Sequence, residues 1–511
     1  MQINSITFLI FYTIFFGVYW ALARRLRTQN VMLLTAGYIF YGWWDWRFLF
    51  LLLFTTLSSY STAIMASRSH RRLWTALNIT VNLAILLCFK YFNFFSENLS
   101  RLLSTFGWNA DSFTIEVLLP IGISFYTFQA ISYSIDVYRR TLSPERNFVT
   151  FATYLSFFPQ LLAGPIERGA DIIPQLSQPR RWDYDLACRG ARETLWGLFK
   201  KVAIADYCGH IVTRFFTDSA HADTWQLTAA AILFSIQIYC DFSGYCNIAR
   251  GLAAMLGIRL MVNFRYPAFS RTPADFWHRW HISLMSWFRD YIYIPLGGSH
   301  SGRARTALNI IIVFTLSGIW HGASWNFVAW GATWGIIMVL SRLAGVRRYQ
   351  TGSIPDTGAA EMSRICLMGW ITVMTFILFR VDDGLTHAWC IITRTWYSVA
   401  LVMLAAGVSI TLLSKLGRHA WALLATLTVA VIATVWTMAG GEVAIQLIIR
   451  LMLPASIVSL FAAEWHGRRE SFALEQLPSR RTPVRMAVYW ILIIAIMVSN
   501  PTDANFIYYQ F

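Results

Sequence analysis

The stretch ALNIIIVFTLSGIWHGASWNFVAWGATWGIIMVL, residues 307–340, is apolar over at least one membrane thickness and contains a single ionisable side chain, His321. A helix needs about 20 apolar residues to cross the hydrocarbon core of a bilayer. An ionisable group at that depth is costly, so by default it indicates a functional site. The stretch therefore predicts membrane-embedded helix and makes His321 the first candidate for chemistry.

The composition of the whole chain agrees with this interpretation. The 511 residues are 56% hydrophobic and only 13% charged, whereas an ordinary soluble domain is about 25% charged. Apolar runs of nearly membrane-spanning length recur from about residue 6 to residue 484. We predict an all-α, polytopic integral membrane protein with about 10–12 transmembrane helices and one or two re-entrant segments. It is expected to form one domain over residues 1–511, with a motif-bearing core at about 115–340 and C-terminal helices at about 365–511.

The net charge of +16 does not indicate nucleic-acid binding, because the basic residues form short clusters between apolar runs. These clusters lie at residues 24–27, 68–72, 139–140, 180–181, 200–201 and 468–469. Such clusters are typical of cytoplasmic loops. The seven cysteines show no CxxC spacing, which argues against a disulfide framework or a zinc knuckle. His278 and His281 are three residues apart but have no third ligand nearby, and we predict no metal site.

Two segments are too irregular to be ordinary membrane spans. FATYLSFFPQLLAGPIERG (151–169) contains Pro159 and the Gly164–Pro165 breaker, which predicts a re-entrant dip. The block RYPAFSRTPADFWHRWHISLMSWFRDYIYIPLGG (265–298) carries too many charges to face lipid. Read as one helix beginning near Pro273 and ending at Gly297–Gly298, it places Trp277 and His281 on one face.

The residues alone leave the roles of the two histidines open. His321 lies between Trp320 and Gly322, where a desolvated imidazole can act as a general base. Alternatively, it is a buried histidine that hydrogen-bonds between helices. His281 lies 40 residues earlier and has a stronger claim to be an ordinary interfacial group beside Arg279.

Two further segments place polar side chains in apolar surroundings. In QIYCDFSGYCNIARG (237–251), Asp241, Ser243 and Asn247 form a polar stripe that should face protein or a water-filled cavity. Hydrogen bonding between helices is at least as good an explanation for them as substrate contact. LLPIGISFYTFQAISYSIDVYR (118–139) contains Gln129 and reads as a bent helix that lines a cavity.

Together these blocks resemble the membrane-bound O-acyltransferase (MBOAT) family, in its bacterial branch of alginate O-acetyltransferase membrane subunits. The resemblance is carried by the segments at 118–139, FFPQLLAGPIER (157–168), IYCDFSGY (238–245), FWHRWHISLMSWFRDYIYIPLGG (276–298) and IWHGASWNFVAWG (319–331). They occur in the family's order over about residues 115–335, and the C-terminal NFIYYQF (505–511) also looks like this branch. One departure follows DFSGY, where Cys246–Asn247 replace the hydroxyl residue and aspartate that relatives often carry, which puts a carboxylate there in doubt.

The resemblance implies a helical fold with a central funnel, His321 as the family's invariant histidine and His281 as its second histidine, both catalytic. Asn326 is a further candidate for orienting the acceptor or the donor. The residues expected to line the funnel or contact substrate are Asp241, Ser243, Asn326, Trp320, Trp277 and Gln129. Arg265, Arg271, Arg303 and Arg305 are candidates for binding the donor's phosphates or an acidic carrier protein; alternatively, they only fix the topology.

The expected function is transfer of an acyl group, most simply acetyl, from a cytoplasmic thioester across the bacterial inner membrane to an exported polysaccharide such as alginate or cellulose. His321 is the predicted base, acetyl-CoA or an acyl carrier the donor, and no cofactor is bound permanently. The expected partners are membrane lipid, a periplasmic SGNH-type acetyltransferase and a polysaccharide synthase or export complex. The alternatives are a transporter or flippase without acyl-transfer chemistry, and a non-catalytic scaffold.

Overall fold

The computed structural model describes residues 1–108, 120–300, 302–346, 349, 353–355, 358–381, 384–416 and 441–499. Within these ranges every regular element is a helix, which confirms the predicted all-α class. The C-terminal motif at 505–511 lies outside the described residues, as does part of the predicted C-terminal helical region.

The described elements follow one another along the chain in this order. The first part comprises α1 (Ile6–Ala21), α2 (Leu26–Gly42), α3 (Arg47–Arg68), α4 (Arg71–Leu86), the π-helix η1 (Leu87–Tyr91), α5 (Phe92–Thr105), α6 (Ile123–Arg139), α7 (Phe148–Ser156), α8 (Phe158–Leu161), α9 (Gly169–Leu176), α10 (Tyr184–Leu198), the π-helix η2 (Phe199–Asp206), α11 (Tyr207–Thr217) and α12 (Thr224–Met255). The second part comprises η3 (Pro267–Phe269), α13 (Pro273–Trp277), α14 (Ile282–Phe288), the π-helix η4 (Arg289–Tyr293), α15 (Arg303–His321), α16 (Trp325–Leu343), α17 (Ala359–Arg380), α18 (Leu385–Leu416), α20 (Gly441–His466), η5 (Leu477–Ser479) and α21 (Thr482–Val498).

Several of these helices have the length and apolar character of membrane spans. Five described segments meet both conditions: Arg47–Arg68, Arg71–Thr105, Thr224–Met255, Ala359–Arg380 and Leu385–Thr411. Ile6–Ala21 and Thr482–Val498 are apolar but shorter. The chain is therefore a multi-pass membrane protein, while the total of 10–12 spans stays a prediction because several predicted crossings fall on short or polar helices.

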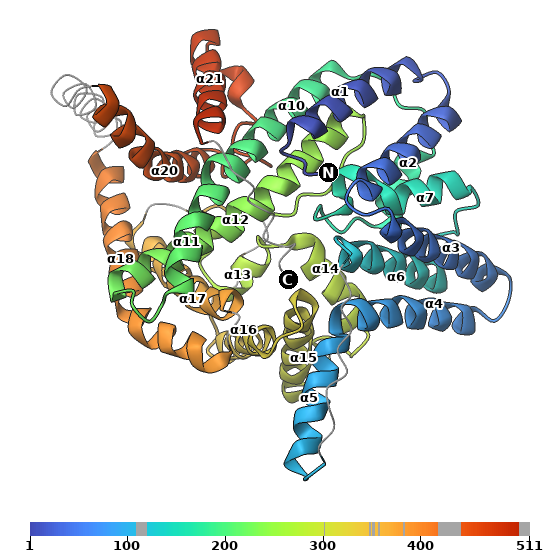
Figure 1. Cartoon of the computed structure of the whole chain (residues 1–511), viewed down its shortest axis with the longest axis horizontal. Coiled ribbons are helices and arrows are strands. Elements are labelled where there is room, and N and C mark those ends of the chain that lie inside the picture. The colour runs from blue at the N-terminus through green and yellow to red at the C-terminus, as the bar shows by residue number, and fades with distance from the viewer. Residues whose placement is uncertain are drawn as a thin grey trace.

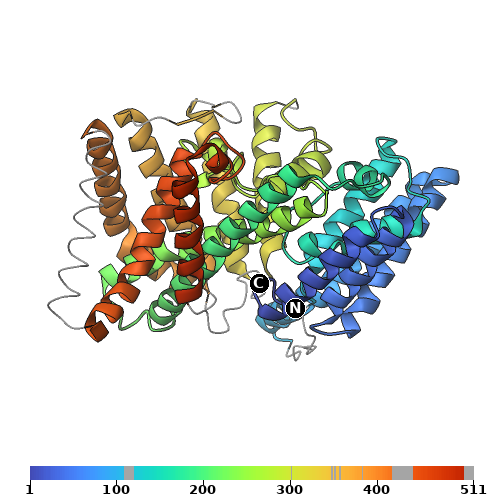
Figure 2. The ribbon, with the colours of Figure 1, turned by 90° about the horizontal axis from the view of Figure 1, so that it is seen from above.

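The long helix α12 lies at the centre of the molecule. In Figure 1 it runs beside α10, with α2, α3, α4, α6 and α7 on one side and α17, α18 and α20 on the other. Figure 2 shows the same separation of the first helices from the last ones when the molecule is seen from above. The central helix thus connects the N-terminal and C-terminal groups of helices, and it carries the polar stripe predicted from the sequence.

Glycines at matching positions bring α10 and α12 close together. A Cβ added at Gly197 would lie 2.6 Å from the carbonyl oxygen of Gly244, and one added at Gly190 would lie 2.5 Å from that of Gly251. Gly190 and Gly197 are seven residues apart in α10, as Gly244 and Gly251 are in α12, so the same two helix faces meet twice. Small residues at such a crossing allow backbone contact between membrane helices. The residues of α12 between Gly244 and Gly251 are therefore held firmly against α10 and η2.

The segment at 148–168 consists of short buried helices, as the prediction of a re-entrant dip required. α7 has nine residues and α8 has four. At 1.5 Å per residue, α7 reaches about 14 Å, roughly half the hydrocarbon core of a bilayer. The side chains from Thr150 to Leu162 are buried. This segment therefore packs inside the protein as helices that are each too short to span a bilayer.

The prediction of one continuous helix after Pro273 is wrong. The helix begins at Pro273 as expected, but α13 ends at Trp277, and α14 begins only after His281. His281 adopts the left-handed conformation with φ 46° and ψ 52°. The physical reason is a long-range contact, because the N–H of Ile282 donates to the carbonyl of Asn263 at 2.9 Å and leaves the helical pattern. Trp277 and His281 therefore do not share a helix face.

The interpretation of Lys200–Lys201 as part of a cytoplasmic loop is also wrong. Both lysines lie in η2, and their exposed fractions are 3% and 5%. Each ammonium is stabilised by a side chain of α12, as described below, which compensates for the loss of water.

Candidate functional site

His321 is the last residue of α15 and is enclosed by aromatic rings. Its exposed fraction is 4%. The centroid of its ring lies 5.1 Å from that of Trp330 and 5.3 Å from that of Phe379. Its Nδ1 lies 2.6 Å from the carbonyl oxygen of Ser317. Because a carbonyl only accepts, Nδ1 of the neutral imidazole carries the hydrogen, and the lone pair is on Nε2.

The turn after His321 is narrow because of glycine. α15 ends at His321, and Ser324 caps the start of α16 by accepting a hydrogen bond from the N–H of Asn326. A Cβ at Gly322 would collide with the ring of Phe327, and a Cβ at Gly318 would collide with the carbonyl of Phe327. The two helices therefore approach each other closely and place the imidazole at the point where the chain reverses.

His281 is fully buried and is held in its left-handed conformation by Asn263. Its Nδ1 lies 3.3 Å from Oδ1 of Asn263, which also accepts from the N–H of Ser283 at 3.0 Å and from its hydroxyl at 2.9 Å. Since Asn263 Oδ1 accepts, Nδ1 of His281 donates and Nε2 carries the lone pair. That Nε2 is buried and has no hydrogen-bond partner among the described residues. A non-glycine residue with positive φ and an orphaned buried nitrogen is typical of a functional site.

The indole of Trp320 brings the two histidines into one site. Its ring centroid lies 4.9 Å from that of His321 and 5.9 Å from that of His281. The Nε1–H groups of Trp320 and Trp330 are buried and have no hydrogen-bond partner within the described part of the chain. The site thus combines two imidazoles with buried N–H donors in apolar surroundings, which are the groups that acyl transfer requires.

Three other predicted residues lie around this site. Asn326 donates from Nδ2 to the carbonyl of Val381, while its Oδ1 is buried without a partner among the residues described. Trp277 contacts Trp330 at 5.9 Å between ring centroids. Gln129 is buried in α6, next to Phe128, whose ring lies 5.5 Å from that of Trp320. The structure therefore places Trp277 against Trp330, which contacts His321, and it places Gln129 on a helix that contacts Trp320 through Phe128.

The polar stripe of α12 is paired with α10 and η2. Asp241 forms an ion pair with Lys201 at 2.7 Å. Ser243 accepts a hydrogen bond from Nζ of Lys200 at 2.9 Å. Asn247 donates to Glu193 at 2.9 Å, and Glu193 also pairs with Arg250. Hydrogen bonding between helices, the alternative considered from the sequence, therefore accounts for Asp241 and Asn247.

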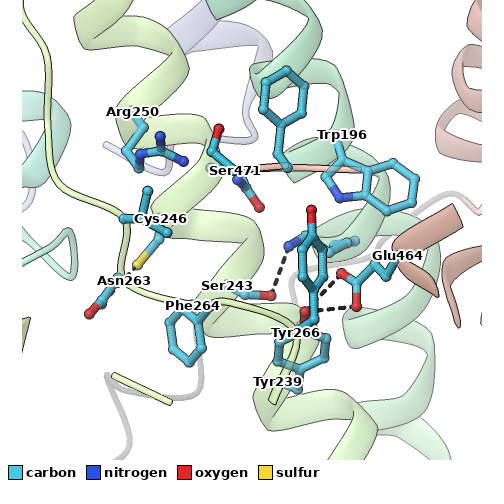
Figure 3. Close-up of a pocket in the computed structure, with 14 residues that line it drawn as sticks. Trp196, Tyr239, Ser243, Cys246, Arg250, Asn263, Phe264, Tyr266, Glu464 and Ser471 are labelled. Carbon is cyan, nitrogen blue, oxygen red and sulfur yellow. Dashed lines mark hydrogen bonds between the residues drawn. The ribbon is translucent and has the colours of Figure 1, made fainter. Parts of the chain in front are cut away.

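Ser243 also lines a pocket on the side of Asn263 (Figure 3). The pocket has about 320 Å³ of empty space, part of it open to solvent, between α10, α12, the 262–266 segment and the 464–472 segment. In Figure 3, the hydroxyl of Tyr239 lies 2.8 and 2.9 Å from the two carboxylate oxygens of Glu464 and donates to them. Lys200, which donates to Ser243, lines the same pocket. Asn263 is the wall shared by this pocket and His281. The pocket therefore adjoins the histidine site.

The four candidate arginines are separated by the structure. Arg271 is buried and ion-paired with Asp275 and Glu361. Arg303 and Arg305 are exposed at the opposite end of α15 from His321, about 27 Å away along a helix axis. Arg265 is exposed and follows Asn263 by two residues. Arg265 is therefore the exposed member of the four that adjoins Asn263, the residue that contacts His281.

Sequence reasoning missed the cations of the site. Lys90 and Lys200 contact site residues, yet neither was selected, because a basic residue at the end of an apolar run resembles a topology signal. Glu464 was missed because its partner Tyr239 is 225 residues away in the chain.

Among the described residues, no group of three or more His, Cys, Asp or Glu side chains could hold a metal ion.

Comparison with known proteins gives the class to which this fold and site belong. The sequence model of the membrane-bound O-acyltransferase family matches residues 75–359, more than half of the chain. A probable alginate O-acetylase of Azotobacter vinelandii is 40% identical over 352 residues, which cover 67% of this chain and 69% of the relative. A probable alginate O-acetylase of Pseudomonas putida is 40% identical over 393 residues, covering 75% and 78%. A peptidoglycan O-acetyltransferase of Helicobacter pylori is 32% identical over 352 residues, covering 63% and 66%.

The chain therefore belongs to the membrane-bound O-acyltransferase family. Within that family it is a membrane-bound O-acetyltransferase.

Proposed function

We propose that this chain transfers an acetyl group from a cytoplasmic thioester to an exported polysaccharide at the bacterial inner membrane, with His321 as the general base. The observation that carries the proposal is the hydrogen bond from Nδ1 of His321 to the carbonyl of Ser317. Because Nδ1 holds the hydrogen, the lone pair of the imidazole is on Nε2, which can accept a proton inside an enclosed aromatic site. The names of the relatives, alginate O-acetylase and peptidoglycan O-acetyltransferase, support a polysaccharide as the final acceptor.

In the proposed reaction, Nε2 of His321 takes the proton from the acceptor hydroxyl as its oxygen attacks the thioester carbonyl. The oxyanion that forms is stabilised by buried N–H donors, for which Trp320 and Trp330 are suited because their indole N–H groups have no partner among the described residues. The carbon–sulfur bond then breaks, and the leaving thiolate takes the proton from His321. His281, whose Nε2 accepts and does not donate, orients the acceptor in this scheme by accepting from a second hydroxyl, because the reacting hydroxyl gives its single hydrogen to His321.

The enclosed site also limits wasteful chemistry. Water that reaches a thioester near a general base hydrolyses it, so exclusion of water by the rings of Trp320, Trp330 and Phe379 preserves the acetyl group. We propose that the acetyl group passes to a periplasmic SGNH-type acetyltransferase working with a polysaccharide synthase or export complex. In this arrangement the membrane protein supplies activated acetyl groups on the far side of the bilayer.

The proposal is tested with purified protein in lipid nanodiscs. Protein is incubated with acetyl-CoA or an acetylated carrier protein labelled in the acetyl group, together with a periplasmic acetyltransferase and polysaccharide. We expect the label to appear in ester linkage on the acceptor, and release of free thiol in equal amount. Movement of substrate across proteoliposomes without any acetyl transfer would instead favour the transporter.

We expect Arg265→Glu to weaken donor binding, because Arg265 is exposed and lies two residues from Asn263, which contacts His281 and lines the adjoining pocket. A charge-assisted hydrogen bond to a phosphate contributes about 1.5–3 kcal/mol, which corresponds to an increase in donor KM of roughly 10- to 100-fold. The kcat at saturating donor should remain near that of the wild type. Arg303→Glu is the matched control, and an equal rise in KM for both variants would show that general surface charge, not Arg265, attracts the donor.

A further inference from the structure

The end of α15 has an unusual requirement for hydrogen bonds. The last four carbonyls of an α-helix have no partner within the helix. In apolar surroundings each unsatisfied carbonyl costs free energy, so another part of the protein must supply donors. Here the last residues are Ile319, Trp320 and His321, and the chain turns at once into α16. The carbonyls beside the proposed base therefore need donors from elsewhere.

Two neighbouring residues of η1 supply them. Nζ of Lys90 donates to the carbonyl of Trp320 at 2.8 Å and to that of His321 at 2.9 Å. The hydroxyl of Tyr91 donates to the carbonyl of Ile319 at 2.9 Å. Three consecutive carbonyls of α15 are thus bound by two consecutive residues that are about 230 positions earlier in the chain. Nζ of Lys90 also lies 5.9 Å from the centroid of the Trp320 indole.

The π-helix explains how both side chains reach the same helix end. Successive residues of a regular α-helix do not face one another, so a plain helix does not readily present two neighbours to one target. The five residues of η1 interrupt the helix between α4 and α5. Single π-turns of this kind are rare and frequently occur at functional sites. The irregularity in η1 thus coincides with the contact to the carbonyls of α15.

A lysine suits this position electrostatically. The C-terminus of a helix carries a partial negative charge of about half an elementary charge, which favours a nearby cation. The ammonium group also has three donors, so it satisfies two carbonyls at once. Tyrosine or an amide in its place would supply fewer donors or no charge. Lys90 as a whole is half-buried, and its Nζ lies against the carbonyls, as expected for a long side chain at an apolar surface.

We propose that Lys90 is a positioning residue for acetyl transfer, which holds the backbone of His321 and the indole of Trp320 so that Nε2 keeps its place relative to the reacting carbonyl. This inference rests on the proposed role of His321 as the base. Lys90 acts through the carbonyls and not on the substrate. Since a displacement of 1 Å in a catalytic group can cost about 100-fold in rate, a clamp on the residue that carries the base is expected to affect kcat.

The test uses Lys90→Met, Lys90→Gln and Lys90→Arg in the full-length protein, in nanodiscs. Lys90→Met is expected to lower kcat by about 100-fold without a comparable change in donor KM, and Lys90→Arg to recover most of the activity. Hydrogen–deuterium exchange of the peptide covering residues 317–324 should become faster in Lys90→Met. Arg101→Met, an exposed cation of α5, is the matched control and should leave kcat and exchange unchanged.

The exchange measurement separates this inference from the proposed function. If the wild type transfers no acetyl group, the proposed function fails, while faster exchange in Lys90→Met still supports the clamp on α15. Wild-type kcat or unchanged exchange in Lys90→Met would overturn the inference. If Lys90→Met does not accumulate, Lys90→Arg and Lys90→Gln decide: a kcat of the Arg variant well above that of the Gln variant supports the positioning role, and equal values overturn it.

Discussion

Replacing His321 with glutamine is expected to abolish acetyl transfer without unfolding the protein. Glutamine retains an N–H donor that can reach the carbonyl of Ser317, and it fills a similar volume between Trp330 and Phe379. It has no group that accepts a proton at neutral pH. Loss of a general base typically costs 10²- to 10⁴-fold in rate. The measurement is labelled acetyl transfer by purified variant, with thermal unfolding in detergent as the check on structure.

His278→Gln provides the matched control for this experiment. His278 lies in the 265–298 block with His281, but it is exposed, between α13 and the turn at His281. We expect this variant to retain wild-type transfer. Normal acetylation by His321→Gln at wild-type protein levels would show that the base is another residue. His281→Gln is informative beside it, since a smaller loss there would agree with an orienting role.

The fold class follows from the sequence because apolar runs of membrane length leave few alternatives. The 307–340 stretch also identifies His321, since no other side chain in it can ionise. What the stretch does not reveal is that it forms two helices that reverse at Gly322. The close approach of the two helices requires a glycine at 318, where a Cβ would collide with the carbonyl of Phe327, and contact between helices is not encoded in hydrophobic periodicity.

The remaining features of the site depend on partners that are distant in sequence. The left-handed turn at His281 arises from Asn263, whose backbone and side chain bind residues 281–283. A local pattern of helix formers gives no sign of such a bond. Lys90 likewise looks like a basic residue that follows an apolar run, and only its contact with the carbonyl of His321 distinguishes it from a topology signal.

The second large effect is expected for Lys201→Met, which should destabilise the protein. Nζ of Lys201 lies 2.6 Å from Asp206 and 2.7 Å from Asp241, and the side chains of all three are less than 8% exposed. Methionine leaves the two carboxylates without this shared cation. Breaking a buried ion pair by removing one partner typically costs about 3–5 kcal/mol. We expect a lower midpoint of thermal unfolding and poor accumulation in the membrane.

Two comparisons make this prediction specific to the buried triad. Arg47→Met removes the partner of Asp45 in an ion pair whose Arg47 side chain is 69% exposed. The hydrogen bond from Arg47 lowers the pKa of Asp45, yet solvent screens exposed pairs of this kind, so we expect little change in the midpoint of thermal unfolding. Asp206→Asn should lower the free energy of unfolding by less than Lys201→Met does, because the pair of Lys201 with Asp241 remains.

Loss of this triad should also disturb the pocket beside His281, because Asp241 is two residues from Ser243 on α12. Lys201→Met protein that does fold should therefore show reduced acetyl transfer. Equal stability of Lys201→Met and Arg47→Met would show that these buried charges are compensated by other groups.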